Sequence, residues 1–254
     1  YFIVTLRLKT HNPMEDYVHL HVHTNYSILD GQSKVTRLVD KAVADGMKGM
    51  AITDHGVMFG IKEFSDYCAK VNKGRKEKGE APFKPVFGCE MYVARRSMHD
   101  KDKGMHDNSG YHLIVLAKNH HGYKNLIKLV SKAWVDGYYY KPRTDREQLE
   151  KYHEDLIVCS ACIAGEIPSK IIHDDIEGAR EACEWYHRVF GDDFYLELQR
   201  HEVKDPTLAA NREAYPLQQK ANRVLLRFAR EYGIKVICTN DCHFEDKETA
   251  EAHD

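Results

Sequence analysis

Seven short stretches of the chain carry the hydrophobic pattern of β-strands, and amphipathic helices are predicted between most of them. The first stretch alternates apolar and polar residues with period two, whereas the later ones are mostly short apolar runs. These strands are expected at residues 17–23, 47–53, 85–93, 111–117, 156–160, 194–198 and 234–239. Helical spacing of apolar residues predicts helices at 33–46, at 59–73, around 126–130, up to 190 and at about 209–232. The alternation favours a parallel β/α architecture, either closed as a barrel or open as a doubly wound sheet.

The chain shows no internal repeat and no low-complexity linker, so residues 17–254 are expected to form one domain. Residues 1–16 are interpreted as an N-terminal extension, because Met14 precedes the first strand and would be a natural start. The acidic end, 245–254, stops abruptly, as though the chain were cut from a longer protein. The polar stretch 95–110 has no periodicity and predicts a mobile loop.

Bulk composition narrows the class of protein. The 254 residues are 43% hydrophobic and 30% charged, as in ordinary globular proteins. No apolar run approaches the about 20 residues of a membrane helix, so no membrane role is expected. A net charge of −2 provides no general basic field for nucleic acid. Seven cysteines without the spacing of a secreted scaffold indicate reduced thiols and a cytoplasmic location. The unusual count is that of histidine, at 16.

The histidines of the first strand suggest a metal site. His19, His21 and His23 follow one another at every second position, so a regular strand would project all three from one face. A single histidine is more often a hydrogen-bonded core residue. A pair at the end of a strand, His21 and His23, with the carboxylate of Asp30 seven residues later, favours metal binding instead.

Further potential ligands follow or lie within the other predicted strands. They are Asp54, His55, Glu90, Cys162, Asp241 and His243. In β/α barrels the active site lies where the strands end, and imidazole, carboxylate and thiolate are the ligands of zinc and its neighbours. Two other interpretations compete with this one. Cys159, Cys162, Cys238 and Cys242 could form a structural zinc site, but the first cysteine of each pair lies inside an apolar strand run. An amidohydrolase barrel would not obviously need Asp30, His55 and His243 together.

Seven motifs spread from Tyr17 to the C-terminus resemble those of one known family. They are HLHVHTNYSILDG at 19–31, AITDHG at 51–56, FGCEMYV at 87–93, HLIVLAKN at 112–119, GYYYKPRTD at 137–145, CSACIAGEI at 159–167 and TNDCHF at 239–244. The chain resembles the polymerase and histidinol phosphatase (PHP) family of metal-dependent phosphoesterases, and within it the PHP domains of bacterial DNA polymerase III alpha subunits. The resemblance implies a distorted (β/α)7 barrel of parallel strands.

The resemblance also implies a complete metal site. The corresponding ligands are His21, His23, Asp30, His55, Glu90, His112, Cys162, Asp241 and His243. They would hold two or three divalent ions of zinc, manganese or iron, with Glu90 as the bridge. His21, His23 and Asp241 would complete one site, His112 and Cys162 a second, and Asp30, His55 and His243 a third. A metal-bound hydroxide held by Glu90, Asp241 and His243 would be the nucleophile.

In the polymerase branch such a site resembles a 3′–5′ exonuclease that acts in proofreading during replication. The substrate would be a DNA 3′ end, bound by Tyr139, Lys141 and Arg143 through aromatic stacking and phosphate contacts. The same tyrosine-rich stretch could instead pack on the rest of the alpha subunit. The implied partners are that remainder and other replisome subunits. Two alternatives remain open: a stand-alone phosphomonoesterase of the histidinol phosphatase type, and a metal-binding scaffold without catalysis.

Overall fold

The computed structural model describes residues 17–203 and 212–246. The proposed extension 1–16 and the end of the chain at 247–254 lie outside the described residues. The strands are β1 (Gly49–Ile52), β2 (Lys84–Val93), β3 (Tyr111–Ala117), β4 (Tyr138–Tyr139), β5 (Lys141–Thr144), β6 (Leu156–Cys159), β7 (Phe194–Gln199) and β8 (Lys235–Thr239). The α-helices are α1 (Val35–Ala44), α2 (Ile61–Glu77), α3 (His120–Val135), α4 (Arg146–Lys151), α5 (Glu166–Ile172), α6 (Ile176–Phe190) and α8 (Ala214–Tyr232). Short 3₁₀ turns are η1 (Lys103–Met105) and η2 (Gly191–Asp193).

The strands form a curled sheet in the order β4-β5-β2-β3-β6-β7-β8, and β1 also pairs with β2. The opening segment 17–23 joins the two ends of this sheet. Its His19 forms a parallel bridge with Met50 of β1, and its Val22 forms one with Cys242, just beyond β8. Backbone hydrogen bonds on both sides support these bridges, such as Ala51 N–H to His19 O at 2.8 Å and His23 N–H to Cys242 O at 2.7 Å. Six of the seven predicted strands therefore form, and the segment 17–23, which makes only isolated bridges, completes an α/β fold that curls into a distorted barrel. The strands β4 and β5 were not predicted.

One strand of this ring, β3, runs in the opposite direction, which corrects the expectation that all seven are parallel. β3 pairs antiparallel with both β2 and β6, whereas β1–β2, β6–β7 and β7–β8 are parallel. The physical reason lies in the connection before it. A parallel neighbour needs a crossover, usually a helix, but residues 94–110 between β2 and β3 contain only the 3₁₀ turn η1.

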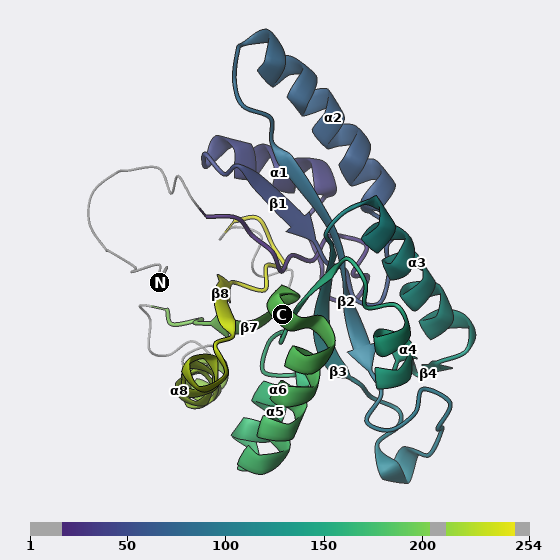
Figure 1. The fold of residues 1–254 in the computed structure, drawn as a ribbon. Helices are drawn as coiled ribbons and strands as arrows, with labels where there is room; N and C mark the ends of the chain where they lie inside the picture. The colour runs from purple at the N-terminus through teal and green to yellow at the C-terminus, as the bar shows by residue number, and fades with distance from the viewer. Residues whose placement is uncertain (1–16, 204–211, 247–254) are drawn as a thin grey trace.

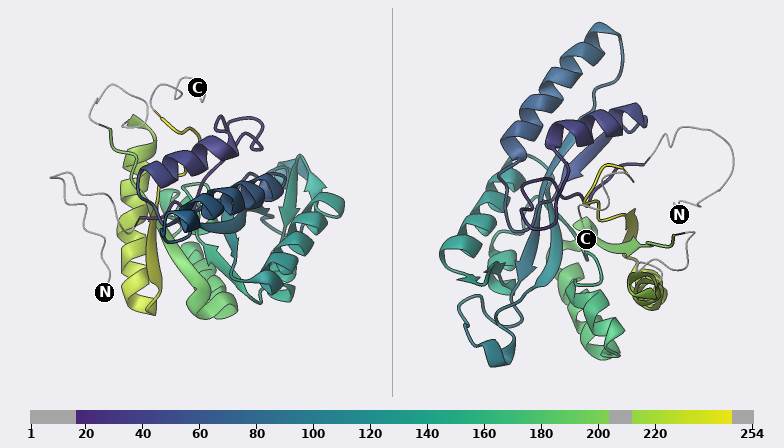
Figure 2. Two further views of the ribbon diagram at one scale, coloured as in Figure 1. Left: turned by 90° about the horizontal axis from the view of Figure 1, so that it is seen from above. Right: turned by 180° about the vertical axis from the view of Figure 1, so that it is seen from behind.

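The helices pack on the outside of the curled sheet (Figures 1 and 2). In Figure 1, α1 and α2 lie together at the top, α3 runs along one side of the long strand β2, and α5 and α6 lie below. Asn119, Asp145 and Asp175 cap the first turns of α3, α4 and α6 by accepting backbone N–H groups. Inside the ring, small and aliphatic residues such as Leu20, Ile114 and Ala161 fill the space.

The loop 94–110, predicted to be mobile, is anchored to the rest of the molecule. Asp107 is buried and accepts hydrogen bonds from Arg96 Nε at 3.2 Å and from the backbone N–H of Asp102 at 2.9 Å. Met98 donates its N–H to Asp145 at 3.0 Å. These contacts fix the loop without regular secondary structure, which is why no periodicity marked it.

Arg143 is the main anchor of this loop, and this corrects its predicted role in binding DNA. Its side chain is fully buried. The guanidinium donates to the carbonyl oxygens of Gly137, Met98 and Asp100 at 3.1, 2.8 and 2.9 Å. A buried cation that is shared among backbone carbonyls cannot reach a phosphate.

Among the described residues, no helix is long and apolar enough to cross a membrane.

Replacing Arg143 by methionine should destabilise the fold, because three buried carbonyl groups lose their donor. We expect the free energy of unfolding to fall by about 2 kcal/mol or more. Urea unfolding followed by circular dichroism measures this change. The neighbouring Lys141→Met variant is the control and should lose less than about 1 kcal/mol. Equal losses in the two variants would contradict a structural role for Arg143.

Candidate metal centre

Nine side chains predicted to be ligands converge at one rim of the barrel. They are His21, His23, Asp30, His55, Glu90, His112, Cys162, Asp241 and His243. His55, Cys162, Asp241 and His243 follow the ends of β1, β6 and β8, whereas Glu90 lies within β2 and His112 near the start of β3. Because β3 is antiparallel, its beginning lies at the same rim as the ends of its neighbours. The reversed strand thus explains how His112 joins the others.

Asp241 lies close to three of the candidate histidine ligands. Its Oδ1 lies 3.0 Å from His21 Nε2, 3.2 Å from His23 Nε2 and 3.2 Å from His243 Nε2. His21 and His23 are completely buried. Asp241 adopts a left-handed backbone with φ of 51°, which is uncommon for any residue other than glycine. Such backbone strain is characteristic of positions where function fixes the direction of a side chain.

Glu90 lies at the centre, with each carboxylate oxygen facing a different group of ligands. Its Oε1 is 2.8 Å from His112 Nδ1 and 3.3 Å from His21 Nε2. Its Oε2 contacts His55 Nδ1. Cys162 Sγ lies 3.7 Å from His112 Nδ1 and so belongs to the Oε1 side. The two oxygens of Glu90 therefore contact different candidate ligands.

A further group of candidate ligands, beside those around Asp241 and Glu90, surrounds His55. Its Nε2 is 2.9 Å from Asp30 Oδ2, and Asp30 Oδ1 is 3.6 Å from His243 Nδ1. The His23 ring stacks on both His55 and His243, with ring centres 4.0 and 4.4 Å apart. Four side chains from three separate parts of the chain therefore meet at this end of the rim.

The residues present fit divalent cations. Three triads have ligand atoms within 4.8 Å of one another: His21–His23–Asp241, His23–His55–His243 and Glu90–His112–Cys162. The Nε2 atoms of His21 and His23 are buried, and neither has a hydrogen-bond partner of normal geometry. Nitrogen, carboxylate oxygen and thiol sulfur form the donor set of zinc and related transition metals.

The electrostatics of the metal-free rim indicate a need for positive charge. Burial lowers the pKa of His55, but hydrogen bonds to Asp30 and Glu90 outweigh it and raise that pKa to about 10. Burial also lowers the pKa of His243, but hydrogen bonds and charge interactions with Asp241 and Asp30 have the larger effect and raise that pKa to about 9. Protons on these imidazoles balance the carboxylates when no cation does so.

Two residues that the sequence did not identify orient the paired histidines. Glu197 of β7 is buried and accepts a hydrogen bond from His21 Nδ1 at 2.7 Å. Ser27 donates to Asp54 at 2.9 Å, so His23 Nδ1, 3.1 Å away, must donate to Ser27. Both arrangements direct the Nε2 atoms at the centre, as ligating histidines require. A glutamate within the otherwise apolar strand 194–198 was the available signal for Glu197.

Asp54, a candidate ligand at the end of the second predicted strand, has a structural role instead. Its carboxylate accepts hydrogen bonds from the Thr24 backbone N–H at 2.7 Å and from Ser27. It thereby holds the turn that follows His23.

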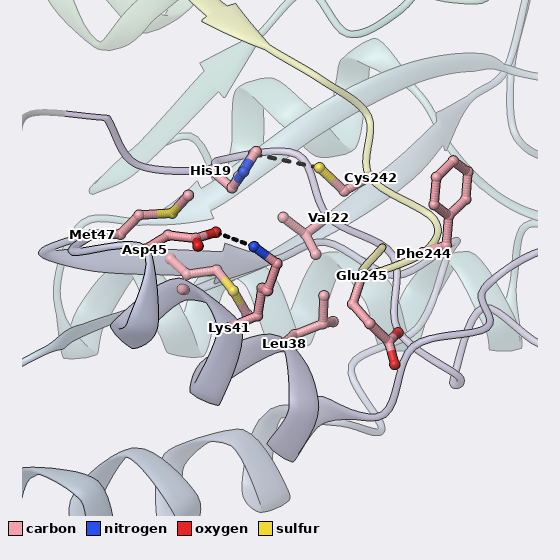
Figure 3. Close-up of a pocket in the computed structure, with 11 residues that line it drawn as sticks. His19, Val22, Leu38, Lys41, Asp45, Met47, Cys242, Phe244 and Glu245 are labelled. Carbon is pink, nitrogen blue, oxygen red and sulfur yellow. Dashed lines mark hydrogen bonds and ion pairs between the residues drawn. The ribbon is translucent and has the colours of Figure 1, made fainter. Parts of the chain in front are cut away.

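His19 does not join His21 and His23, which corrects the expectation that all three share one face. The strand alternation is broken within the segment, since Leu20 packs inside the ring together with Ile114. His19 instead faces Cys242, with Nδ1 3.4 Å from Sγ, in a separate pocket of about 220 Å³ beside α1 (Figure 3). The alternation rule holds only while the backbone stays regular.

Comparison with known proteins identifies the family. The sequence model of the family described as "PHP domain" matches residues 19–201 of this chain. The chain belongs to the PHP domain family. This confirms the family predicted from the seven motifs.

Curated relatives of this PHP domain include polymerase subunits. The DNA polymerase III subunit alpha of Borreliella burgdorferi is 42% identical over 238 residues, which cover 94% of this chain and 19% of the relative. Those of Treponema pallidum and Thermus aquaticus are each 38% identical, over 94% of this chain and 18% of their own length. The chain thus spans about a fifth of the length of the relatives it matches.

Among solved structures, this PHP domain is similar to the histidinol phosphate phosphatase of Lactococcus lactis, determined with zinc, L-histidinol and phosphate. The TM-score is 0.41 and the identity 14%, over 93% of this chain and 89% of that chain.

Substituting Glu197 by glutamine should weaken metal binding without removing a ligand. The amide can present its N–H₂ group to His21 Nδ1, which favours the wrong tautomer. We expect the affinity for zinc to fall by about tenfold or more, measured by competition with a chromophoric chelator. Glu181→Gln, on the exposed face of α6, is the matched control. An unchanged affinity in Glu197→Gln would show that zinc binding does not depend on the hydrogen bond between His21 and Glu197.

Proposed function

We propose that this PHP domain is a metal-dependent phosphoesterase that removes nucleotides from a DNA 3′ end, as a 3′–5′ exonuclease in proofreading. The observation that carries the proposal is the position of Glu90, whose two oxygens face separate groups of ligands. A carboxylate shared between cations suits phosphoryl chemistry, in which attacking and leaving oxygens are stabilised together.

The chain's own residues hold and orient the reacting groups. Bound cations supply a water of lowered pKa and neutralise charge on the phosphoryl oxygens. Glu90, Asp241 and His243 would hold them at the centre of the rim. The fixed tautomers of His21 and His23 mean that these side chains need no rearrangement to bind. The ligand positions are therefore largely preorganised.

Lys141 is the cation best placed to meet a substrate phosphate. Its Nζ lies 5.1 Å from the centre of the Tyr92 ring. That ring is in turn 5.2 Å from the ring of His112 and 6.2 Å from that of His55. Lys141 thus remains a proposed substrate-binding residue, together with Tyr139 beside it.

The number and identity of the metals belong to the proposal as well. Three triads of donor atoms support two or three ions. The thiol of Cys162 favours zinc in its triad, whereas the triad that includes Asp241 also suits manganese or iron.

The relatives support DNA as the substrate. They are alpha subunits of DNA polymerase III, of which this chain spans about a fifth. We therefore propose that the domain works in the cytoplasm, joined to the rest of an alpha subunit and alongside other replisome subunits.

Glu90→Gln should abolish hydrolysis, because the amide keeps the shape but loses the bridging charge. With zinc or manganese present, release of 3′-terminal nucleotides from a labelled oligonucleotide should fall by about a hundredfold or more. Glu181→Gln should retain full activity.

The same assay separates the alternatives. Full activity in Glu90→Gln would contradict a mechanism that depends on shared cations. Hydrolysis of L-histidinol phosphate without any attack on DNA would point to a phosphomonoesterase. Metal binding with no hydrolysis of either ester would identify a scaffold.

A further inference from the structure

The short hairpin β4–β5 lies directly beside the candidate metal centre. β5 pairs with the end of β2, where Arg143 stands opposite Tyr92. Pro142 packs closely on Gly56: a Cβ added to that glycine would lie 2.6 Å from Pro142 Cγ. Gly56 directly follows His55. The hairpin is therefore part of the rim that a substrate must cross.

Three large aromatic side chains are exposed on this hairpin and on the end of α3. Trp134, Tyr138 and Tyr140 are 43%, 48% and 58% exposed. The rings of Trp134 and Tyr138 stack on each other, with centres 5.4 Å apart and planes inclined by 18°. Trp134 Nε1 donates to Gly56 O at 2.7 Å. The indole is thus held in a fixed orientation beside the metal centre.

Tyr140 occupies a position where tyrosine is unfavourable. It is the single residue between β4 and β5, and its φ is 62°. Glycine or asparagine normally takes this left-handed conformation, which disfavours bulky side chains. Burial does not compensate, because the ring is largely in solvent. Strained residues cluster at active sites and ligand-binding positions, and this one exposes an aromatic ring on the hairpin beside the candidate metal centre.

We propose that Trp134, Tyr138 and Tyr140 form a platform that stacks the unpaired bases of single-stranded DNA. Lys141, next to Tyr140, contacts the phosphate between the stacked bases and the metal centre. Sequence-independent binding of single strands combines aromatic faces with a cation in this way. The inference rests on the proposed function, since the platform would bind the same DNA strand whose 3′ end the metal centre would cleave.

Continuity with the metal centre decides the occupant. The platform, Lys141 and the ligand histidines adjoin one another through Gly56 and Tyr92. A strand with its last phosphate at the metal centre would pass Lys141 and place its preceding bases on the exposed rings. An aromatic face that packs on another protein would need neither the cation nor the adjoining site.

Tryptophan fluorescence provides a direct test, using the metal-free chain so that hydrolysis plays no part. The chain has two tryptophans, and Trp185 is only 7% exposed. A single-stranded oligothymidylate should quench the emission of Trp134, and Trp134→Phe should remove that signal. Tyr138→Ala and Tyr140→Asn should each weaken binding by at least about fivefold, whereas Tyr138→Phe should stay within about twofold.

Thermal unfolding of the same variants separates stacking from folding. Asparagine tolerates the left-handed conformation, so Tyr140→Asn should bind more weakly without any loss of Tm. Unchanged affinity in Tyr138→Ala and Tyr140→Asn, or equal binding of a blunt duplex, would overturn the platform. Absence of quenching would overturn it too. If the chain binds the oligothymidylate but shows no hydrolysis with metal present, the platform is supported and only the proposed phosphoesterase function is contradicted.

Discussion

The structure depends on one electrostatic constraint: three carboxylates, Asp30, Glu90 and Asp241, meet in a small and largely buried space. Each has its pKa held below the usual range: burial alone would raise it, but the surrounding histidines outweigh that effect. Buried negative charge must be balanced. Without cations the balance comes from protons on His21, His55 and His243, whose pKa values the carboxylates raise. Divalent metals would replace those protons, so the charge arrangement itself is the argument for metal binding.

The fold is arranged to make this convergence possible. The segment 17–23 closes the ring between β1 and the chain beyond β8, and so brings His21 and His23 next to Asp241. The reversal of β3 adds His112 from a strand that would otherwise place its first residues at the opposite rim. Glu197 and Ser27 then fix the imidazoles from behind. Preorganisation of this kind limits the cost of binding cations and substrate.

Six of the strands and the nine converging residues could be predicted because short-range patterns and motifs mark them, whereas the short strands β4 and β5 carry no such pattern. Other features depend on contacts between distant segments. The direction of β3 follows from the connection 94–110, which offers no crossover helix. Arg143 resembles a surface cation in an aromatic stretch, yet carbonyls from that same connection bury it. His19 follows the alternation in sequence but not in space, because the backbone of 17–23 is irregular.

Metal content tests the central claim most directly. Elemental analysis of the chain, purified without chelator or His tag and reconstituted with zinc or manganese, should give two or three equivalents per chain. The double variant His21→Ala/His23→Ala should lose them, whereas His19→Ala, from the same segment but outside the centre, should retain them. No bound metal after reconstitution would contradict the account.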